Sequence, residues 1–418
     1  MALPNMIRIR QHFEAPEVDD IAGTVKAQIA GLNLQSRVKT GDSVAISVGS
    51  RGINEIALIT KSIVDAVKDL GGEPFIVPAM GSHGGGTAEG QQQIVESYGV
   101  TAEYVGCEIR ATMDVVQVGT VEGEVPVYFD KYAAEADHVV VAGRIKPHTG
   151  FVGEIESGLH KMMLIGLGKH KGAALYHQAI VQYSFDRIIR AVASEVIDKC
   201  GILFGLAIVE NQYDHTAMIE AVAPENFAER ERELLVLAKK WMPRLPFDRV
   251  DLLVIDEIGK NISGSGLDSN VVGRKFYEHC AAEKEFPKVT RILVRDLTPE
   301  THGNAAGVGT SEYIHQRVID KMDVESTVIN CMTGNAPSGA AIPIAFPTDR
   351  ECMEKALETV GYVAPENARV LRIRNTLQLG ELWVSEAYAD EVGKREDLSV
   401  VTDAAQMELD DQGDLLTW

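Results

Sequence analysis

Cysteine is scarce in this chain, and no two cysteines form a close pair. The five cysteines of the 418-residue sequence lie far apart, at Cys107, Cys200, Cys280, Cys331 and Cys352. An odd count without a Cys-x-x-Cys pair argues against a disulfide scaffold, a zinc knuckle and an iron–sulfur site. The chain also lacks the run of about 18 apolar residues that a membrane span requires. The N-terminal stretch MALPNMIRIRQHF has no apolar core or cleavage site, so we expect a cytoplasmic protein.

Positive charge is also in short supply. Lysine and arginine number 40 against 61 aspartates and glutamates, which gives a formal net charge of −21. A surface this acidic repels nucleic acid and anionic lipid at long range, so we expect neither as a partner. The acidity by itself is also explained by solubility alone. An anionic substrate would have to be held by basic groups that gather in one place.

Aromatic residues make up only 6% of the chain, whereas glycine is abundant at 38 residues. This balance suits an enzyme with many loops at strand ends, where the backbone approaches a ligand closely. The length exceeds that of one ordinary core and predicts two or three domains.

Short apolar runs alternate with helical patterns along the chain. Residues 43–48 (SVAISV) and 75–80 (FIVPAM) are apolar runs, and residues 53–70 between them carry apolar residues at helical spacing. A Gly-rich loop follows each run, which predicts strand–helix–strand units in a parallel sheet. The same order returns in the second half of the chain, at DLLVIDEIGKNISGSG and TRILVRDLTPETHGNAAGVG.

A break near residues 243–249 divides these two halves, because the stretch WMPRLPFDRVD contains two prolines. We therefore predict two α/β domains, at residues 1–247 and 248–395, with parallel-sheet units in each. We expect the active site in the cleft between them. The sequence leaves open whether the polar, acidic tail at 396–418 packs back on the first domain or frays.

Two histidines follow apolar runs directly. His83 lies in the loop AMGSHGGGTAEGQ, and His148 lies in GRIKPHTG beside Arg144 and Lys146. Both loops are expected at the carboxyl ends of strands, where open α/β sheets bind their ligands. A single loop histidine is most often solvated or structural, but two at equivalent strand ends make an acid–base pair an equal alternative.

Residues 156–178, ESGLHKMMLIGLGKHKGAALYHQ, concentrate cationic and metal-binding groups in an acidic protein. The segment holds six of them: Lys161, Lys169, Lys171, His160, His170 and His177. It contains no His-x-x-x-His or Glu-x-x-His pair of a conventional zinc site. A solvated basic face of an amphipathic segment explains the spacing equally well.

Two Gly-rich loops resemble phosphate-binding loops only weakly. GSRG contains Ser50 and Arg51, and GSHGGG contains Gly84 and Gly85. Neither matches a nucleotide-binding signature, yet backbone N–H groups of such loops can hold an anion. Arg51 could pair with a carboxylate through two hydrogen bonds, although it could equally cap a loop carbonyl. In the second half, Arg274 is a candidate for reaching across to the first domain.

Taken in order, these motifs resemble the nickel-pincer lactate racemase family. The order is GSRG, then GSHGGGTAEG, then KPH, and then a lysine and a histidine sixteen residues apart (177 − 161). The resemblance covers most of the chain. It implies a nickel pincer nucleotide as cofactor, the Ni(II) pyridinium-3,5-bisthiocarboxylate mononucleotide, in which two sulfurs and a ring carbon hold the metal.

The resemblance also implies a role for each matching residue. Lys161 looks like the lysine that tethers the cofactor as a thioamide, and His177 looks like the nickel ligand, with His170 as its rival. His83 and His148 look like the paired acid–base histidines. Arg51 looks like the arginine that orients the substrate. Proteins that synthesise the cofactor are then expected partners.

This chain departs from the family pattern in three places. It has VGSR where the family has Asp-x-Thr-Arg, so an acidic residue is missing, and GEIESGLHK replaces a shorter Ser-Gly-Gly-x-Lys approach to the tethering lysine. The family's Gln and Lys from the second domain have no clean match. Arg274 is the nearest candidate for a substrate-binding residue from that domain.

We therefore expect a racemase or epimerase that acts on a small anionic 2-hydroxy acid. Reversible hydride transfer to the cofactor avoids a carbanion, and a histidine suits removal of the hydroxyl proton. The many hydroxyl-bearing loop residues favour a polyhydroxylated acid such as a sugar acid over lactate. A metal-dependent sugar-acid dehydratase or lyase, and a non-catalytic nucleotide-binding homologue, are the alternatives.

Overall fold

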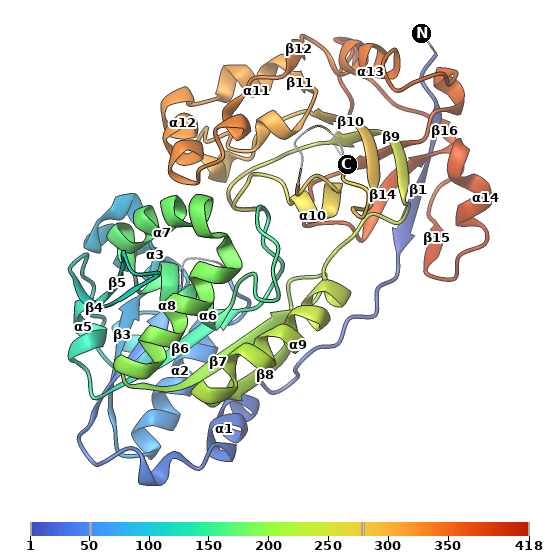
Figure 1. Cartoon of the computed structure of the whole chain (residues 1–418). Helices are drawn as coiled ribbons and strands as arrows, with labels where there is room; N and C mark the ends of the chain where they lie inside the picture. The colour runs from blue at the N-terminus through green and yellow to red at the C-terminus, as the bar shows by residue number, and fades with distance from the viewer. Residues whose placement is uncertain (1, 50–51, 277–278, 280, 417–418) are drawn as a thin grey trace. The chain divides into compact units, whose positions relative to one another are not determined.

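The structure is a computed structural model that describes residues 2–49, 52–276, 279 and 281–416. It divides the chain into two compact units (Figure 1). The first unit is Ala15–Met242, and the second combines Met1–Glu14 with Pro243–Trp418. Parallel strands form a sheet in each unit, which confirms the predicted α/β class. Among the described residues, no helix combines the length and apolar character needed to cross a bilayer.

The first unit is built on a five-stranded sheet in the order β3-β2-β6-β7-β8. The first four of these strands run parallel, and β8 is antiparallel to β7. The sheet strands are β2 (Ser43–Val48), β3 (Glu73–Pro78), β6 (His138–Arg144), β7 (Ile202–Glu210) and β8 (Thr216–Val222). A separate hairpin consists of β4 (Val115–Val121) and β5 (Val125–Asp130).

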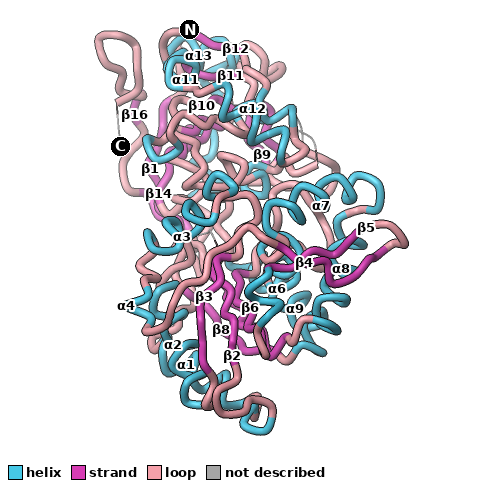
Figure 2. Tube along the Cα trace, turned by 90° about the vertical axis from the view of Figure 1, so that its left-hand side faces the viewer, coloured by secondary structure: helices cyan, strands magenta, loops and turns pink. Residues whose placement is uncertain are grey.

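Helices cover both faces of this sheet, because its strands are apolar on both sides. Val139 and Val141 of β6 pack into one apolar cluster with α8 and α9, whereas Val140 and Ala142 pack into another with α1 and α2. Figure 2 shows α2 and α4 on one side of the strands and α8 and α9 on the other. The helices are α1 (Ile21–Gly31), α2 (Ile56–Asp69), α3 (Ala88–Ser97), α4 (Ala102–Val105), α5 (Lys131–Glu135), α6 (Leu159–Lys161), α7 (Lys169–Tyr183), α8 (Phe185–Lys199) and α9 (Phe227–Trp241).

The second unit is built on a nine-stranded sheet with the path β12-β11-β10-β9-β13-β14-β1-β15, and β16 pairs with β1. Its strands are β1 (Asn5–Gln11), β9 (Arg249–Ile255), β10 (Lys288–Val294), β11 (Tyr313–His315), β12 (Ile344–Phe346), β13 (Val370–Ile373), β14 (Glu381–Ser385), β15 (Leu398–Val400) and β16 (Ala405–Gln406). Its helices are α10 (Ser269–Val272), α11 (Gln316–Lys321), α12 (Val324–Thr333), α13 (Asp349–Leu357) and α14 (Ala389–Val392).

The N-terminal strand belongs to the second unit, whereas the sequence predicted a first domain at residues 1–247. The reason is that β1 pairs antiparallel with β14 and β15 and buries Met6 and Ile9 there. The tail predicted at 396–418 neither frays nor joins the first unit over its described residues. Its strands β15 and β16 both pair with β1.

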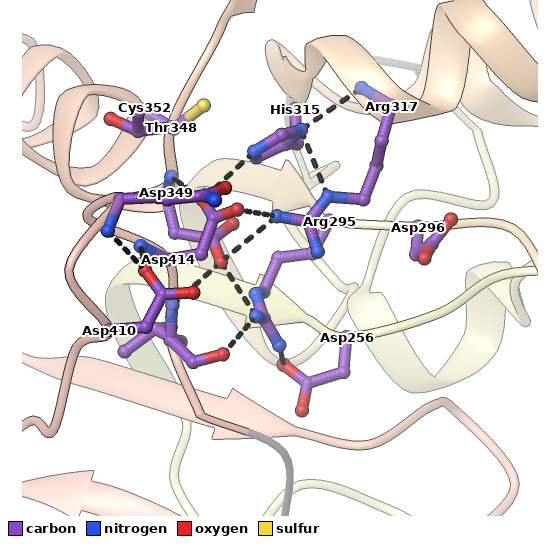
Figure 3. A network of polar contacts seen from close by, with 12 residues as sticks. Asp256, Arg295, Asp296, His315, Arg317, Thr348, Asp349, Cys352, Asp410 and Asp414 are labelled. Carbon is purple, nitrogen blue, oxygen red and sulfur yellow. Dashed lines mark hydrogen bonds and ion pairs between the residues drawn. The ribbon is translucent and has the colours of Figure 1, made fainter.

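Charged side chains also fasten the tail to the second unit (Figure 3). Asp414 accepts a hydrogen bond from the backbone N–H of Asp349 at 2.9 Å and pairs with His315 and Arg317 at 3.0 and 2.7 Å. The backbone carbonyl of Leu415 accepts from Arg295 at 2.8 Å. Ligand atoms of His315, Asp349 and Asp414 lie within 4.8 Å of one another, as in a metal site. Because the carboxylates are already paired with arginines, we interpret the cluster as an anchor for the tail.

Candidate active site

The predicted histidines lie in loops at one edge of the five-stranded sheet. Strands β2, β3, β6 and β7 run parallel, so their carboxyl ends share this edge. His83 follows β3 and His148 follows β6. Both imidazoles are partly exposed, as groups that meet a ligand must be. The structure thus brings the two loops to the place where open α/β sheets bind ligands.

A turn of three left-handed glycines follows His83. Gly84, Gly85 and Gly86 have φ values of 67°, 65° and 66°, and they form the short 3-10 turn before α3. A Cβ atom at Gly84 would lie 2.5 Å from the carbonyl carbon of Gly90, so only glycine fits there. This close contact fixes the His83 loop against the start of α3. The expectation that Gly84 and Gly85 bind the cofactor stays a prediction.

His148 has a defined hydrogen-bonding state. Its Nδ1 atom accepts hydrogen bonds from the backbone N–H groups of Gly150 and Phe151, at 2.9 and 3.2 Å. A nitrogen that accepts cannot carry the proton, so the neutral ring carries it on Nε2. The ring also stacks on Phe151 with 4.6 Å between centroids. To take up a proton at Nε2, the ring must first release its two Nδ1 hydrogen bonds.

Lys161 ends helix α6 and precedes a π-helical turn, η3 (Met162–Gly166). Such turns are uncommon and occur often at functional sites. A Cβ atom at Gly143 would lie 2.8 Å from Cγ of Met162, and one at Gly49 would lie 3.4 Å from its Cε. These glycines stand at the ends of β6 and β2. The segment after Lys161 therefore lies against the same edge of the sheet as the two histidines.

A buried carboxylate holds helix α6 in place. Glu231 of α9 accepts hydrogen bonds from the backbone N–H groups of Leu159 and His160 and from the ring Nδ1 of His160. Both Glu231 and His160 are almost fully buried. This contact fixes the backbone directly before Lys161. His160 is therefore a structural residue here and not part of a solvated basic face.

His177 lies on α7 with an unsatisfied ring nitrogen. Its Nδ1 is buried and has no hydrogen-bond partner within the described part of the chain. Burial lowers the pKa of His177, and the positive charge of Lys161 lowers it further. A neutral imidazole with a free nitrogen is the form that ligates a metal. The structure thus brings His177 and Lys161, two predicted cofactor-binding residues, within electrostatic reach of each other.

His170, the rival ligand, lies elsewhere on the same segment. It is exposed in the first turn of α7, and a Cβ atom at Gly86 would lie 3.8 Å from its ring. His170 therefore lies beside the glycine turn after His83. Lys171 is exposed as well, whereas Lys169 is fully buried. A solvated basic face accordingly describes only part of the segment at 156–178.

Ser50 and Arg51 lie outside the described residues, so their predicted roles in cofactor and substrate binding stay predictions. Arg274 is described, and it does not fit a substrate-binding role. Its guanidinium is buried and donates to the backbone oxygens of Thr310, Val289 and Thr290 and to the Glu312 carboxylate. This side chain stabilises the interior of the second unit.

Two buried carboxylates that no sequence motif predicted support the site. Glu156 is fully buried, accepts from the backbone N–H of His148 at 2.9 Å and pairs with Lys239 at 2.7 Å. Glu231 was missed too, although a signal existed. It falls at helical spacing among the apolar positions Phe227 and Leu234, on the face that α9 buries. A carboxylate on an apolar stripe indicates a buried hydrogen-bond acceptor.

Comparisons with known proteins find similarity to lactate racemases. Residues 5–186 match the family model of the lactate racemase N-terminal domain. The chain is also similar to the solved structure of the lactate racemase apoprotein from Thermoanaerobacterium thermosaccharolyticum, with 14% sequence identity and a TM-score of 0.52. That similarity covers 89% of this chain and 98% of that one. No curated protein matches the chain. These findings confirm the predicted resemblance to the lactate racemase family and its fold.

Proposed function

We propose that the protein is a racemase or epimerase of a 2-hydroxy acid, because residues 5–186 match the family model of the lactate racemase N-terminal domain. We propose the nickel pincer nucleotide as its cofactor. The observation that carries the proposal is the environment of His177. Its buried Nδ1 has no hydrogen-bond partner among the described residues, and the positive charge of Lys161 helps to lower the pKa of the ring.

The residues present fit this cofactor. Lys161 would hold it through the thioamide link, and His177 would supply the fourth nickel ligand, since a soft planar donor set with an imidazole suits Ni(II). When bound, the cofactor would accept a hydride from the hydroxyl-bearing carbon of the substrate. The Glu231 carboxylate, which holds the backbone of Leu159 and His160, and the close contact of Met162 with Gly143 would keep the tether in one place.

The two histidines would handle the hydroxyl proton. One would take it as the carbon is oxidised, and either could return it as the carbon is reduced again. His148 can donate from Nε2 in its present state, and it can accept only after its Nδ1 bonds open. A polyhydroxylated acid remains our preferred substrate class, because the loops are rich in hydroxyl-bearing residues.

Mass spectrometry and metal analysis of the intact protein test the proposal. After co-expression with cofactor biosynthesis proteins, wild type should carry one nickel and added mass on the peptide that contains Lys161. Lys161→Ala should lose both, whereas Lys171→Ala, an exposed lysine of the same segment, should keep both. His177→Ala should lose nickel and His170→Ala should retain it.

An activity assay separates the alternatives. A racemase should lower the enantiomeric excess of L-lactate, or interconvert D-gluconate and its C2 epimer, without net loss of acid. A dehydratase or lyase would instead consume the acid irreversibly. Wild-type protein without an adduct on Lys161 would refute the pincer proposal.

A further inference from the structure

Lys169 is a buried charge at the start of α7, inside the segment that joins Lys161 to His177. Its side chain is fully buried, and its backbone has the unusual φ of +55°. The ammonium lies 3.0 Å from Oδ2 of Asp130 and donates to the backbone oxygen of Pro78 and, at 3.2 Å, to Oε1 of Gln91. Burial lowers the pKa of Lys169 and raises that of Asp130, whereas the ion pair between them shifts each pKa in the opposite direction.

Gln91 connects this charge to the His83 loop. The amide is fully buried on α3, and its oxygen accepts from Lys169. Its nitrogen donates to the backbone oxygens of Gly81 and His83, at 2.9 and 3.3 Å. One amide group is therefore hydrogen-bonded to Lys169 through its oxygen and to the backbone of His83 through its nitrogen.

The network joins two parts of the candidate site that are distant in sequence. One part is the continuous segment of Lys161, Lys169 and His177, and the other is the loop of His83. An apolar pair could fill the same space without the cost of burying two charges. Unlike an apolar pair, the polar groups restrict how the two parts are oriented, because ammonium, amide and carbonyl groups form hydrogen bonds only within a narrow range of distances and angles.

We propose that Lys169, acting through Gln91, is a positioning residue that sets His83 relative to Lys161 and His177. This inference rests on the proposed function. Acid–base catalysis depends on placement, and an error of about 1 Å can cost a factor of about 100 in rate. Asp130 supports the network through its ion pair with Lys169.

Gln91→Glu tests the link selectively. The new carboxylate still accepts from Lys169, but it repels the carbonyls of Gly81 and His83 instead of donating to them. In the loaded enzyme we expect unchanged Lys161 adduct and nickel, KM within about twofold and kcat lower by about 100-fold. Amide exchange should accelerate in residues 80–87. Gln93→Glu, an exposed position on the same helix, is the matched control and should behave as wild type.

Gln91→Met and the double variant Lys169→Met/Asp130→Asn guard against misfolding of the first variant, because both remove the hydrogen bonds without leaving an unpaired charge in the interior. Either should repeat the kcat loss with the adduct retained. Turnover within twofold of the control, or loss of adduct and nickel in parallel with activity, would overturn the positioning role.

Failure of the proposed function gives a different pattern. Wild type would then carry no adduct and turn over neither L-lactate nor D-gluconate. Amide exchange still decides the inference in that case. Unchanged exchange at residues 80–87 in all three variants would show that the network does not hold the His83 loop.

Discussion

Among single residues, His177 has an environment that keeps its ring neutral. Burial and the charge of Lys161 both lower its pKa, so the imidazole stays unprotonated below the ordinary value of about 6.5. Lys161→Ala removes one of the two causes, and the pKa of His177 should rise toward the ordinary value. An NMR titration of the ring in the cofactor-free protein measures this, with Lys171→Ala as the control. A wild-type pKa at or above 6.5 would contradict the prediction.

His148 offers a second prediction at this scale. Because Gly150 and Phe151 both donate to Nδ1, the neutral ring should carry its proton on Nε2. The ¹⁵N chemical shifts of the two ring nitrogens distinguish this tautomer from the other. We expect the Nε2–H form near pH 7 in the substrate-free protein. Observation of the Nδ1–H form would mean that the loop at 148–151 is arranged differently in solution.

At the scale of elements, α6 depends on a residue from another helix. Glu231 accepts three hydrogen bonds from Leu159 and His160, all of them buried. Glu231→Gln replaces one acceptor oxygen with a donor that faces other donors, so it should cost about 1–3 kcal/mol in the free energy of unfolding. Urea denaturation measures the loss. Glu229→Gln, exposed on the same helix, should change stability by less than about 0.5 kcal/mol.

The sequence predicted the elements of the first unit well where local patterns decide them. The run at 43–48 is β2, the run at 75–80 overlaps β3 (Glu73–Pro78), and the helical pattern at 53–70 contains α2 (Ile56–Asp69). Apolar periodicity fixes such elements because each buries one face. The same patterns could not place Lys169, whose burial depends on a carboxylate from β5 and an amide from α3. Pairing of buried charges is a tertiary property that spacing along one segment does not encode.

At the scale of the whole molecule, the sequence located the division near residue 243 but not the membership of the first 14 residues. The alternation of apolar and polar residues in NMIRIRQ is typical of a strand, which is β1, yet nothing local identifies the partners of this strand. Those partners, β14 and β15, come from the other end of the chain. Arg10 pairs with Glu381 across this distance, which no window of neighbouring residues reveals.

The tail anchor gives the last prediction, which concerns acid stability. Burial alone would raise the pKa of Asp414, but the hydrogen bonds from Asp349 N–H and His315 and the charge of Arg317 together hold it below its ordinary value. A carboxyl whose pKa is lower in the folded state stabilises the fold above the unfolded value of about 3.9 and loses that effect as the pH falls further. Asp414→Asn should therefore destabilise the second unit at pH 7 by about 2 kcal/mol, and the difference from wild type should shrink below about pH 4.

Thermal unfolding followed between pH 3 and pH 7 measures this difference. Asp411→Asn, an exposed residue of the same turn, is the matched control and should track wild type throughout. Amide exchange localises the effect, since the loss of Asp414 should expose the start of α13, where Asp349 donates to it. A constant destabilisation across the whole pH range would show that Asp414 acts through its shape and not through its charge.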